Sequence, residues 1–407
     1  MTASILLDVS RLLGRANRGS PTGIDRVEHA YAEQLMLQAP ERLVFVAIDK
    51  LDRLRPLPMG ATRRFITMLG EHWTGQGASA ADIGAAAKMI WVQALLRPML
   101  RPLVRPGAER PFYLLLSHRH LHRRARLERA MAPMRARLIT FIHDLIPIEF
   151  PEYARPQHAD LHLARIQTAA ALSEAIIANS HATATSLAPY LAASGRDLPV
   201  LVAPLGTHAL PAPALAPPVM DRPYFVCLGT IEPRKNHLLL LNIWRRMAQQ
   251  RLGDAPRLVI VGRRGWEHEN VEDMLERCPG VRDLVTERTH LSDDEIGSLM
   301  RGARALLFPS FAEGYGLPLA EAMASGVPAI CSDLPALQEV GGSAPDYLDP
   351  LDGPGWMAAI QAYADPASPR RDAQLARMRG WTGATWPLHV RSALGFLGGL
   401  PQMRAAA

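Results

Sequence analysis

The sequence predicts an α/β protein of two domains. Short apolar runs of strand length alternate with helical patterns along the chain, which is the element order of an α/β protein. A chain of 407 residues is long for one hydrophobic core and suits two domains of ordinary size. Residues 207–222 are rich in proline and alanine, lack a clear periodicity and precede a second series of strands. We therefore expect a first domain at 1–206, a linker at 207–222 and a second domain at 223–385.

Each expected strand is a short apolar run bounded by turn residues or by a helical pattern. The tail, residues 386–407, has a helical pattern around His389–Leu397. The expected strands are Ile5–Val9, Leu43–Ile48, Phe112–Leu116, Leu138–Ile142, Ala175–Ala178 and Val200–Ala203 in the first domain, and Tyr224–Leu228, Arg257–Val261, Ala305–Phe308 and Pro328–Cys331 in the second.

Composition indicates a globular protein of the cytoplasm. The hydrophobic fraction is 48%, and three scattered cysteines, Cys227, Cys278 and Cys331, indicate reduced thiols. The amino terminus has only a brief apolar run with no basic region before it, so we expect a first strand there and not a signal peptide. No stretch approaches the roughly 20 apolar residues of a membrane span.

Two glutamates eight positions apart bracket a glycine-containing loop. Glu313 follows an apolar run that a proline closes, so it lies on a loop beyond a strand's carboxyl end. Pro318 suits the first turn of a helix and Gly326 suits its end, which places this helix at 317–325. Glu321 then projects from the second turn of the helix.

Gly314 and Gly316 leave the backbone of this loop bare. Its N–H groups and the positive end of the helix can therefore approach an anion. Taken alone, the pattern also fits the strand-to-helix joint of any α/β protein, with both glutamates solvated.

A second strand end carries adjacent cations. The strand at 224–228 runs into Gly229 and Thr230 and then into Arg234 and Lys235. The whole chain holds only three lysines, so a lysine at this position is not a product of composition. Lysine offers phosphate a compact charge and arginine a planar fork, which suits a diphosphate. A solvated pair at a helix entry is the alternative.

Together these motifs resemble those of the retaining glycosyltransferases of family four. Glu313 and Glu321 resemble the family's signature of two glutamates separated by seven residues, and Gly229–Asn236 resembles a variant of mannosyltransferase-like members in bacterial polysaccharide assembly. Asp333–Gly342 resembles the segment after the signature helix. The resemblance implies the GT-B fold, with two Rossmann-like domains whose parallel sheets face an interdomain cleft.

In the amino half the resemblance is sparser. Thr22–Val27 resembles the loop beneath the donor phosphates, Phe141–Leu145 resembles the family's histidine turn, and Asn179–His181 resembles its serine turn. The resemblance also implies that the final helix crosses back to the first domain. In one respect the chain departs from the family: Thr230 stands where many members have arginine, so which guanidinium touches the diphosphate stays open.

The resemblance implies a role for each site residue. Lys235 and Arg234 meet the leaving diphosphate, Glu313 lies on the sugar's side, and His143 reaches the sugar from the first domain. No metal ligand or divalent cofactor is implied, and the nucleotide sugar is the donor substrate. The catalytic candidates are Glu313, His143, Lys235 and Arg234; the donor-binding candidates are Gly23, Gly229, Thr230, Arg263, Gly314, Tyr315, Gly316, Leu317 and Glu321.

The expected reaction transfers a hexose, with mannose from GDP-mannose preferred, to a hydroxyl of a lipid-linked saccharide, with retention at the anomeric carbon. Two mechanisms can give retention, and both remain alternatives: a covalent intermediate, or same-face attack assisted by the leaving phosphate. Three alternatives remain: a GT-B nucleotide-sugar epimerase, a phosphorylase, and a catalytically silent scaffold in a polymer-assembly complex.

The region 97–137 concentrates positive charge in the first domain. A threefold repeat of two apolar residues, arginine and proline spans 95–106, and proline at every fourth residue predicts an extended chain. Anionic lipid attracts such clusters, so this region is a candidate for contact with the inner face of the cytoplasmic membrane; a solvated basic face is the alternative. Nucleic acid is not expected, because stacking aromatics are not interleaved with the arginines.

Three alternating histidines follow the predicted strand at 112–116. An extended segment would place His118, His120 and His122 on one side of the chain. A metal site would need further ligands in register, so we expect histidines that are exposed or that line a cleft.

Overall fold

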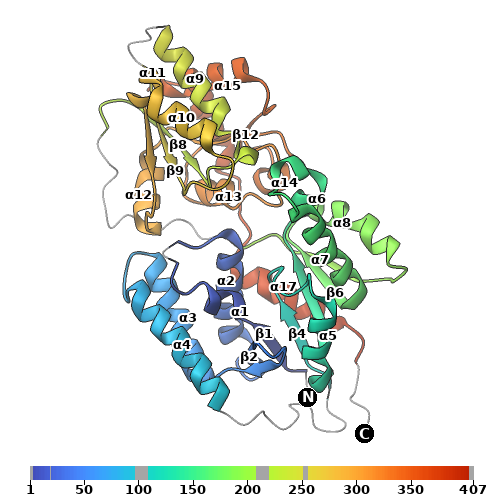
Figure 1. Cartoon of the computed structure of the whole chain (residues 1–407). Coiled ribbons are helices and arrows are strands. Elements are labelled where there is room, and N and C mark those ends of the chain that lie inside the picture. Colours follow the sequence, from blue (N-terminus) through green and yellow to red (C-terminus); the bar gives the residue numbers. More distant parts are fainter. Residues whose placement is uncertain (1–2, 19, 97–108, 208–219, 251–254, 403–407) are drawn as a thin grey trace. The chain divides into compact units, whose positions relative to one another are not determined.

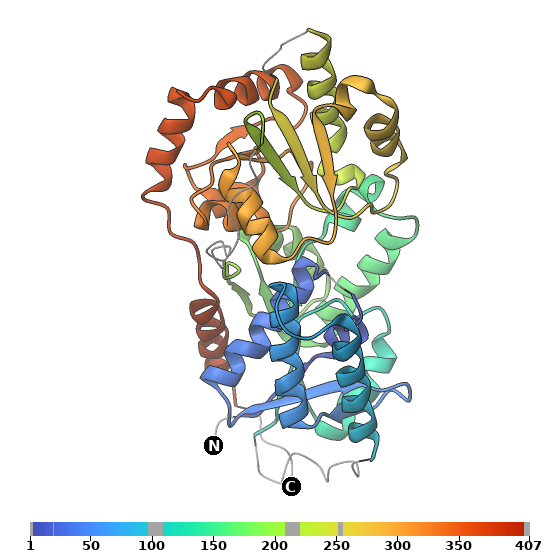
Figure 2. The same ribbon diagram turned by 90° about the vertical axis from the view of Figure 1, so that its left-hand side faces the viewer.

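The computed structural model describes residues 3–18, 20–96, 109–207, 220–250 and 255–402. The chain divides into two compact units, each an α/β unit with helices on both faces of its sheet (Figures 1 and 2). Unit 1 comprises Met1–Pro151, Pro156–Gly206 and Ala384–Ala407, and unit 2 comprises Glu152–Arg155 and Thr207–Gly383. The predicted α/β fold class is confirmed.

Within its described residues, unit 1 holds a seven-stranded sheet in the order β3-β2-β1-β4-β5-β6-β7. All neighbouring strands are parallel except β2 and β3, which form an antiparallel pair. Apart from that antiparallel edge, the order is that of a doubly wound Rossmann sheet. The strands are β1 Ile5–Asp8, β2 Leu43–Ile48, β3 Leu54–Pro56, β4 Phe112–Leu115, β5 Arg137–Ile142, β6 Ser173–Ala178 and β7 Val200–Val202.

The helices of unit 1 follow its strands in alternation. α2 begins at a capping box, in which Thr22 accepts from the N–H of Asp25 while the Asp25 side chain accepts from the N–H of Thr22. The helices are α1 Ser10–Gly14, α2 Gly23–Gln38, α3 Met59–Trp73, α4 Ala80–Leu96, α5 Arg124–Met131, α6 Ile146–Glu149, α7 His158–Leu172, α8 His181–Ala193 and α17 Trp386–Gly399.

The last helix, α17, is part of unit 1. His389 on α17 bonds through Nδ1 to the carbonyl of Pro204 at 2.8 Å and through Nε2 to the hydroxyl of Tyr31 at 2.7 Å. Tyr31 is buried on α2, and the Trp386 and His389 rings contact it edge to face. This polar and aromatic cluster attaches the end of the chain to the domain in which the chain begins.

Unit 2 holds a six-stranded sheet within its described residues, in the order β10-β9-β8-β11-β12-β13, with every pair parallel. This too is the doubly wound order, which reverses between β8 and β11. The strands are β8 Tyr224–Leu228, β9 Arg257–Val261, β10 Val285–Arg288, β11 Leu306–Phe308, β12 Ala329–Ser332 and β13 Asp346–Leu348. The helices are α9 His237–Gln249, α10 Glu269–Arg277, α11 Pro279–Arg282, α12 Asp293–Gly302, α13 Leu317–Ala324, α14 Pro335–Gly341, α15 Gly353–Ala364 and α16 Pro369–Met378.

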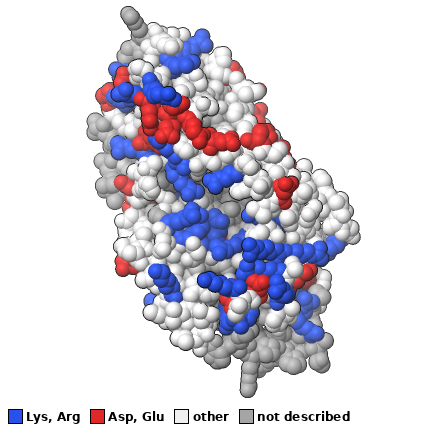
Figure 3. Space-filling model, viewed as in Figure 1, with Lys and Arg blue, Asp and Glu red and all other residues white. Residues whose placement is uncertain are grey.

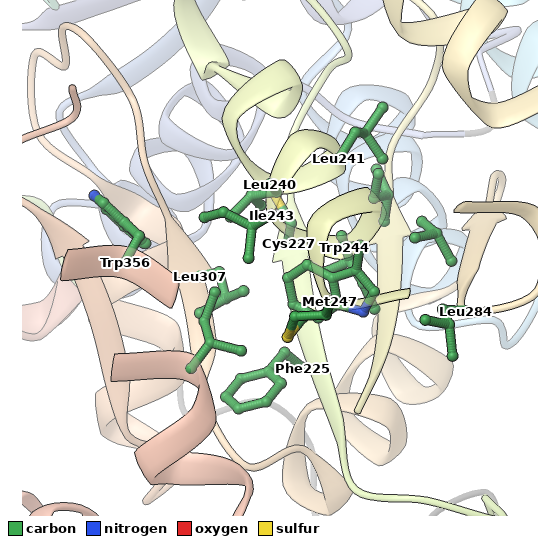
Figure 4. Packing of buried hydrophobic residues seen from close by; sticks show 14 of the residues in the cluster. Phe225, Cys227, Leu240, Leu241, Ile243, Trp244, Met247, Leu284, Leu307 and Trp356 are labelled. Carbon is green, nitrogen blue, oxygen red and sulfur yellow. The ribbon is translucent and has the colours of Figure 1, made fainter. Parts of the chain in front are cut away.

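The core of unit 2 fixes α9 on the sheet. Trp244 and Met247 on α9 are buried against Phe225 of β8, and the Phe225 and Trp244 rings meet edge to face with centroids 6.2 Å apart (Figure 4). The indole N–H of Trp244 donates to the carbonyl of Pro256 at 2.7 Å, so the buried ring has a partner. Packing of α9 onto β8 therefore holds the loop between them, which carries the predicted cations.

The prediction of an extended segment for the three histidines is wrong. Residues 117–122 form bends and turns, and His120 has a φ of 70°. Most of the arginine and proline repeat, from residue 97 onward, lies outside the described residues. Among the described residues, no helix is long and apolar enough to cross a membrane.

Candidate active site in unit 2

The candidate site lies where the strand order of unit 2 reverses. The loop after β8 carries Arg234 and Lys235, and the loop after β11 carries Glu313. Since β8 and β11 are parallel neighbours, both loops leave the carboxyl edge of the sheet side by side. Ligands of doubly wound folds bind in the crevice at this switch point.

One carboxylate meets both cations. Lys235 Nζ donates to Oε1 of Glu313 at 2.5 Å, and Arg234 Nη1 lies 3.1 Å from Oε2 of Glu313. Arg234 also donates to Oε1 of Glu232 at 2.8 Å and to the carbonyl of Ala312 at 2.7 Å. Two cations and two carboxylates therefore form a closed ion cluster in which every charge has a partner.

Burial and neighbouring charge set the protonation of this cluster. Burial opposes the charge of Glu313, but Lys235 and Arg234 outweigh it and lower the pKa of Glu313 to about 2. Burial lowers the pKa of Lys235, an effect that Glu313 opposes and Arg234 strengthens. The Lys235 ammonium also lies 4.7 Å from the centre of the Phe308 ring, a cation–π contact. Glu313 is thus a carboxylate throughout the neutral pH range.

Glycine shapes the turn into α13. Gly316 has a φ of 105°, and a Cβ at this position would lie 2.4 Å from a methyl carbon of Leu337. Only glycine combines this conformation with close packing of α13 on α14. Leu317 is the first residue of α13, Tyr315 is buried, and Glu321 lies half-buried on the second turn of the helix.

A second loop lies against the cation loop. The N–H of Ile231 donates to the carbonyl of Arg263, and the N–H of Gly265 donates back to the carbonyl of Ile231, both at 2.9 Å. A Cβ on Gly262 would lie 1.8 Å from the carbonyl oxygen of Gly229, so the two loops are in contact at their glycines. Arg263 itself is exposed beside this contact.

Arg264 anchors this second loop to its surroundings. Its guanidinium lies 2.5 Å from Glu272 and 3.4 Å from Glu276 on α10, and 2.9 Å from Glu287 on β10. Figure 3 shows acidic side chains gathered over α10. We did not predict Arg264 or Glu232 as site residues. The glycines at 262 and 265 are the sequence feature from which contact between the two loops could have been predicted.

The predicted residues of unit 1 lie at the carboxyl edge of its own sheet. Gly23 is the first residue of α2, and Asp25 in that first turn binds Arg11 at 2.7 Å and Arg15 at 2.9 Å. His143 follows β5, and its Nε2 must carry the proton because it donates to the carbonyl of Leu116 at 2.7 Å. Burial lowers the pKa of His143 to about 4, so the ring is neutral at pH 7.

The serine turn supports the histidine turn. The side-chain amide of Asn179 donates to the carbonyl of His143 at 2.9 Å, and the hydroxyl of Thr183 donates to the same carbonyl at 3.3 Å. Ser180 caps α8 by accepting from the N–H of Thr183 at 3.0 Å. These bonds fix the backbone of His143, and the bond from Nε2 to Leu116 leaves Nδ1 of the neutral ring as its hydrogen-bond acceptor.

The structure thus brings Arg234, Lys235 and Glu313 into direct contact and places Gly229, Thr230, Arg263, Gly314, Tyr315, Gly316, Leu317 and Glu321 on the same edge of unit 2. Gly23 and His143 belong to unit 1. Across the described residues, we find no group of three or more histidine, cysteine, aspartate or glutamate residues arranged to hold a metal ion.

The chain is similar in sequence and fold to known proteins. Residues 222–364 match the family model of glycosyl transferases group 1. The chain is 37% identical over 141 residues to the O-antigen chain mannosyltransferase B of Escherichia coli, a match that covers 34% of this chain and 35% of that protein. It is 30% identical over 255 residues to the serotype-specific mannosyltransferase WbdA of Escherichia coli, covering 56% and 30%. The chain thus spans about a third of the length of these relatives.

The fold is similar to that of Anabaena Alr3699/HepE in complex with UDP and glucose, with a TM-score of 0.62 and 14% identity over 97% of this chain and 100% of that one. The chain therefore has the GT-B fold, and its residues 222–364 match the family model of glycosyl transferases group 1.

Proposed function

We propose that this protein is a retaining hexosyltransferase that moves mannose from GDP-mannose to a hydroxyl of a lipid-linked saccharide in cell-surface polysaccharide biosynthesis. The observation that carries the proposal is the contact of Glu313 with both Lys235 and Arg234 at the switch point of the unit 2 sheet. The names of the relatives, an O-antigen chain mannosyltransferase and a serotype-specific mannosyltransferase, support mannose as the sugar.

The ion cluster suits a diphosphate leaving group. As the bond to the sugar breaks, negative charge grows on the diphosphate, and Lys235 and Arg234 stabilise it together with the N–H groups at the start of α13. These groups supply the positive charge that a divalent metal would otherwise bring, so we propose a metal-independent step. Chelation of divalent ions is then expected to leave turnover unchanged.

Glu313 has a complementary task. When the diphosphate takes up the two cations, the carboxylate loses its partners and is free to face the positive charge that develops on the sugar. Glu313 enters this change as a carboxylate, because the two cations lower its pKa to about 2, and the positive charge that develops on the sugar then takes their place as its partner. Glu321 on α13 is proposed to hold the ribose hydroxyls.

Unit 1 contributes the acceptor-binding domain in this proposal. The backbone of Gly23 at the start of α2 is proposed to meet the donor diphosphate, and His143 offers a neutral ring whose Nδ1 accepts from a hydroxyl. The acceptor is proposed to be lipid-linked, which requires access to the inner face of the cytoplasmic membrane. The basic side chains of unit 1 are the candidates for that contact.

The thermal midpoint of the protein tests donor binding. The protein is heated with GDP, UDP, ADP, dTDP and CMP at equal concentration, since a ligand at 100 times its dissociation constant adds about 2.7 kcal/mol. A rise with GDP above that with the other nucleotides is expected. A larger rise with another nucleotide diphosphate would replace GDP-mannose, and no rise with any would support a silent scaffold.

A further inference from the structure

A basic cavity lies outside the ion cluster, on unit 1. It has a volume of about 410 Å³ and is lined by Asp52, Arg123, Arg124, Ala125, Arg126 and Arg129. Arg123 precedes α5, Arg124, Arg126 and Arg129 lie along α5, and Asp52 comes from the turn between β2 and β3. Figure 3 shows Lys and Arg side chains gathered over α5, with acidic side chains between them.

The fold holds this cavity at the carboxyl edge of the unit 1 sheet. α5 begins after the loop that leaves β4, and the turn that carries Asp52 leaves the carboxyl end of β2. Buried Asp49 shapes that turn, because it accepts from the N–H groups of Leu51 and Arg53 and from the Arg55 side chain. The carboxyl edge is where ligands of doubly wound sheets bind.

Asp52 is the anion that the cavity already contains. One oxygen of Asp52 contacts Nε of Arg126, and the other lies 3.1 Å from Nη2 of Arg129. Arg126 is fixed further by donation to the carbonyl of Asp49 at 3.0 Å. Asp52 has a φ of 59°, a conformation that few residues other than glycine adopt, so the turn holds this carboxylate against the arginines.

The charges of the cavity do not cancel. Four arginines and Asp52 line the cavity, and Glu128 binds Arg124 at 3.2 Å, so four positive and two negative charges leave a net positive charge of two. α5 has no acidic residue in its first turn and no side-chain cap, so the start of the helix adds to the positive field. Guanidinium groups bind phosphate oxygens in pairs, and a phosphate dianion would neutralise the excess.

We propose that this cavity binds a phosphate ester, as a second anion site separate from the diphosphate site of unit 2. The assignment of the ester to the acceptor or to a lipid headgroup rests on the proposed function, whereas the site itself does not. In both cases the ligand presents phosphate oxygens to Arg123 and Arg124, and it shares Arg126 and Arg129 with Asp52.

Titration calorimetry with inorganic pyrophosphate tests the site. Wild type is expected to bind at two sites, R123Q/R124Q is expected to lose one, and K235A is expected to lose the other. The exposed pair Arg63 and Arg64 on α3 gives the matched control, R63Q/R64Q, which keeps both sites. Unchanged stoichiometry in R123Q/R124Q would overturn the proposal, and loss of both sites in K235A alone would assign all binding to unit 2.

A variant that binds pyrophosphate more tightly distinguishes the proposed site from misfolding, which could also explain weaker binding in R123Q/R124Q. D52N removes the competing carboxylate and is expected to tighten pyrophosphate binding about two- to fivefold, the size of an exposed charge interaction. Weaker or unchanged binding in D52N would contradict the role given to Asp52. A misfolded protein cannot produce the expected gain.

Two further experiments, a KM measurement and vesicle sedimentation, identify the molecule that carries the phosphate. If the ester belongs to the acceptor, R123Q/R124Q raises KM for a saccharide carrying a diphosphate but not for the same saccharide without it. If it belongs to a lipid, the variant loses sedimentation with vesicles of anionic lipid and keeps its KM. Failure of the proposed transferase activity would leave the calorimetric result intact, so the two proposals fail separately.

Discussion

Lys235 and Glu313 are joined by a hydrogen bond of 2.5 Å, although 78 positions of the chain separate them. The sheet order explains the contact, because β8 and β11 are neighbours while β9 and β10 lie on the other side of β8. Arg234 completes the cluster at 3.1 Å from the second oxygen of Glu313. In the proposed function, this arrangement places a paired carboxylate where a sugar diphosphate binds.

Replacing Glu313 by glutamine is expected to reduce kcat by about 100- to 1,000-fold, the loss seen when one electrostatic contact to a transition state is removed. Binding of the nucleotide diphosphate is expected to change far less, because the cations remain. Single-turnover kinetics and calorimetry measure the two effects. Exposed Glu269 on α10 supplies the control, E269Q, which should behave as wild type. Equal turnover in wild type and E313Q would remove Glu313 from the mechanism.

Replacing Lys235 by alanine is expected to weaken both binding and turnover. Loss of a hydrogen bond to a charged group costs about 1.5–3 kcal/mol, which corresponds to roughly 10- to 150-fold in the dissociation constant for the nucleotide diphosphate. Lys88 on α4 is exposed and provides the control, K88A. A variant K235A that binds nucleotide as tightly as wild type would show that the diphosphate lies elsewhere.

Arg264 is expected to act by positioning the loop that lies against the cation loop. R264M breaks its contacts with Glu272, Glu276 and Glu287, which should raise KM for the donor severalfold while kcat changes less. Arg257 also forms a charged pair on unit 2, with Asp221, and R257M is the matched control. If both variants raise KM equally, the effect is general loosening of unit 2 and not loop positioning.

Alanine at Gly262 is expected to destabilise unit 2 by about 2 kcal/mol or more, because its Cβ would overlap the carbonyl of Gly229. Gly380 has open space around it, so G380A should change the free energy of unfolding little. Urea denaturation measures both. If G262A has the same free energy of unfolding as wild type, the two loops can separate without loss of stability.

Glu28 is expected to make stability fall as pH rises. Its carboxyl is buried on α2, and burial raises its pKa to about 8, with Ser117 opposing and Asp8 strengthening the shift. Below its ordinary value of 4.5 the group is protonated in both states. Between pH 4.5 and 8 the unfolded chain releases this proton while the folded protein keeps it, so the free energy of unfolding declines across that window.

E28Q removes this titration. The free energy of unfolding of E28Q should rise relative to that of wild type between pH 5 and pH 8, by at most about 4 kcal/mol, since each of these three pH units contributes at most about 1.4 kcal/mol. Thermal or urea unfolding at several pH values measures the difference. Parallel pH profiles for E28Q and wild type would show that Glu28 keeps an ordinary pKa.

The fold was largely predictable because its central strands are buried on both faces and read as apolar runs. All ten predicted strands are present, and the helix expected at 317–325 is α13, Leu317–Ala324. The strands that we missed lie at or next to sheet edges: β3 contains arginine and proline, β10 is largely polar, and β13 has three residues. Edge strands bury fewer side chains, so they lack the apolar run on which the prediction rests.

The candidate site was predictable in its residue types but not in its contacts. Arg234, Lys235 and Glu313 were chosen as ligands of a donor, and the sequence held no sign that they bind one another. Arg264 was missed because its three partners come from two separate elements, α10 and β10. Pairing of this kind depends on sheet order and loop geometry, which single-sequence patterns do not contain.

Acceptor-dependent release of nucleotide diphosphate tests the central claim most directly. The protein is incubated with GDP-mannose and with UDP-glucose, each with and without a diphosphate-linked saccharide, and the products are followed by NMR. We expect release of GDP only with acceptor, an α-linked product formed with retention, and loss of both in E313Q. Sugar interconversion without acceptor would indicate an epimerase, and no release from either donor would contradict the account.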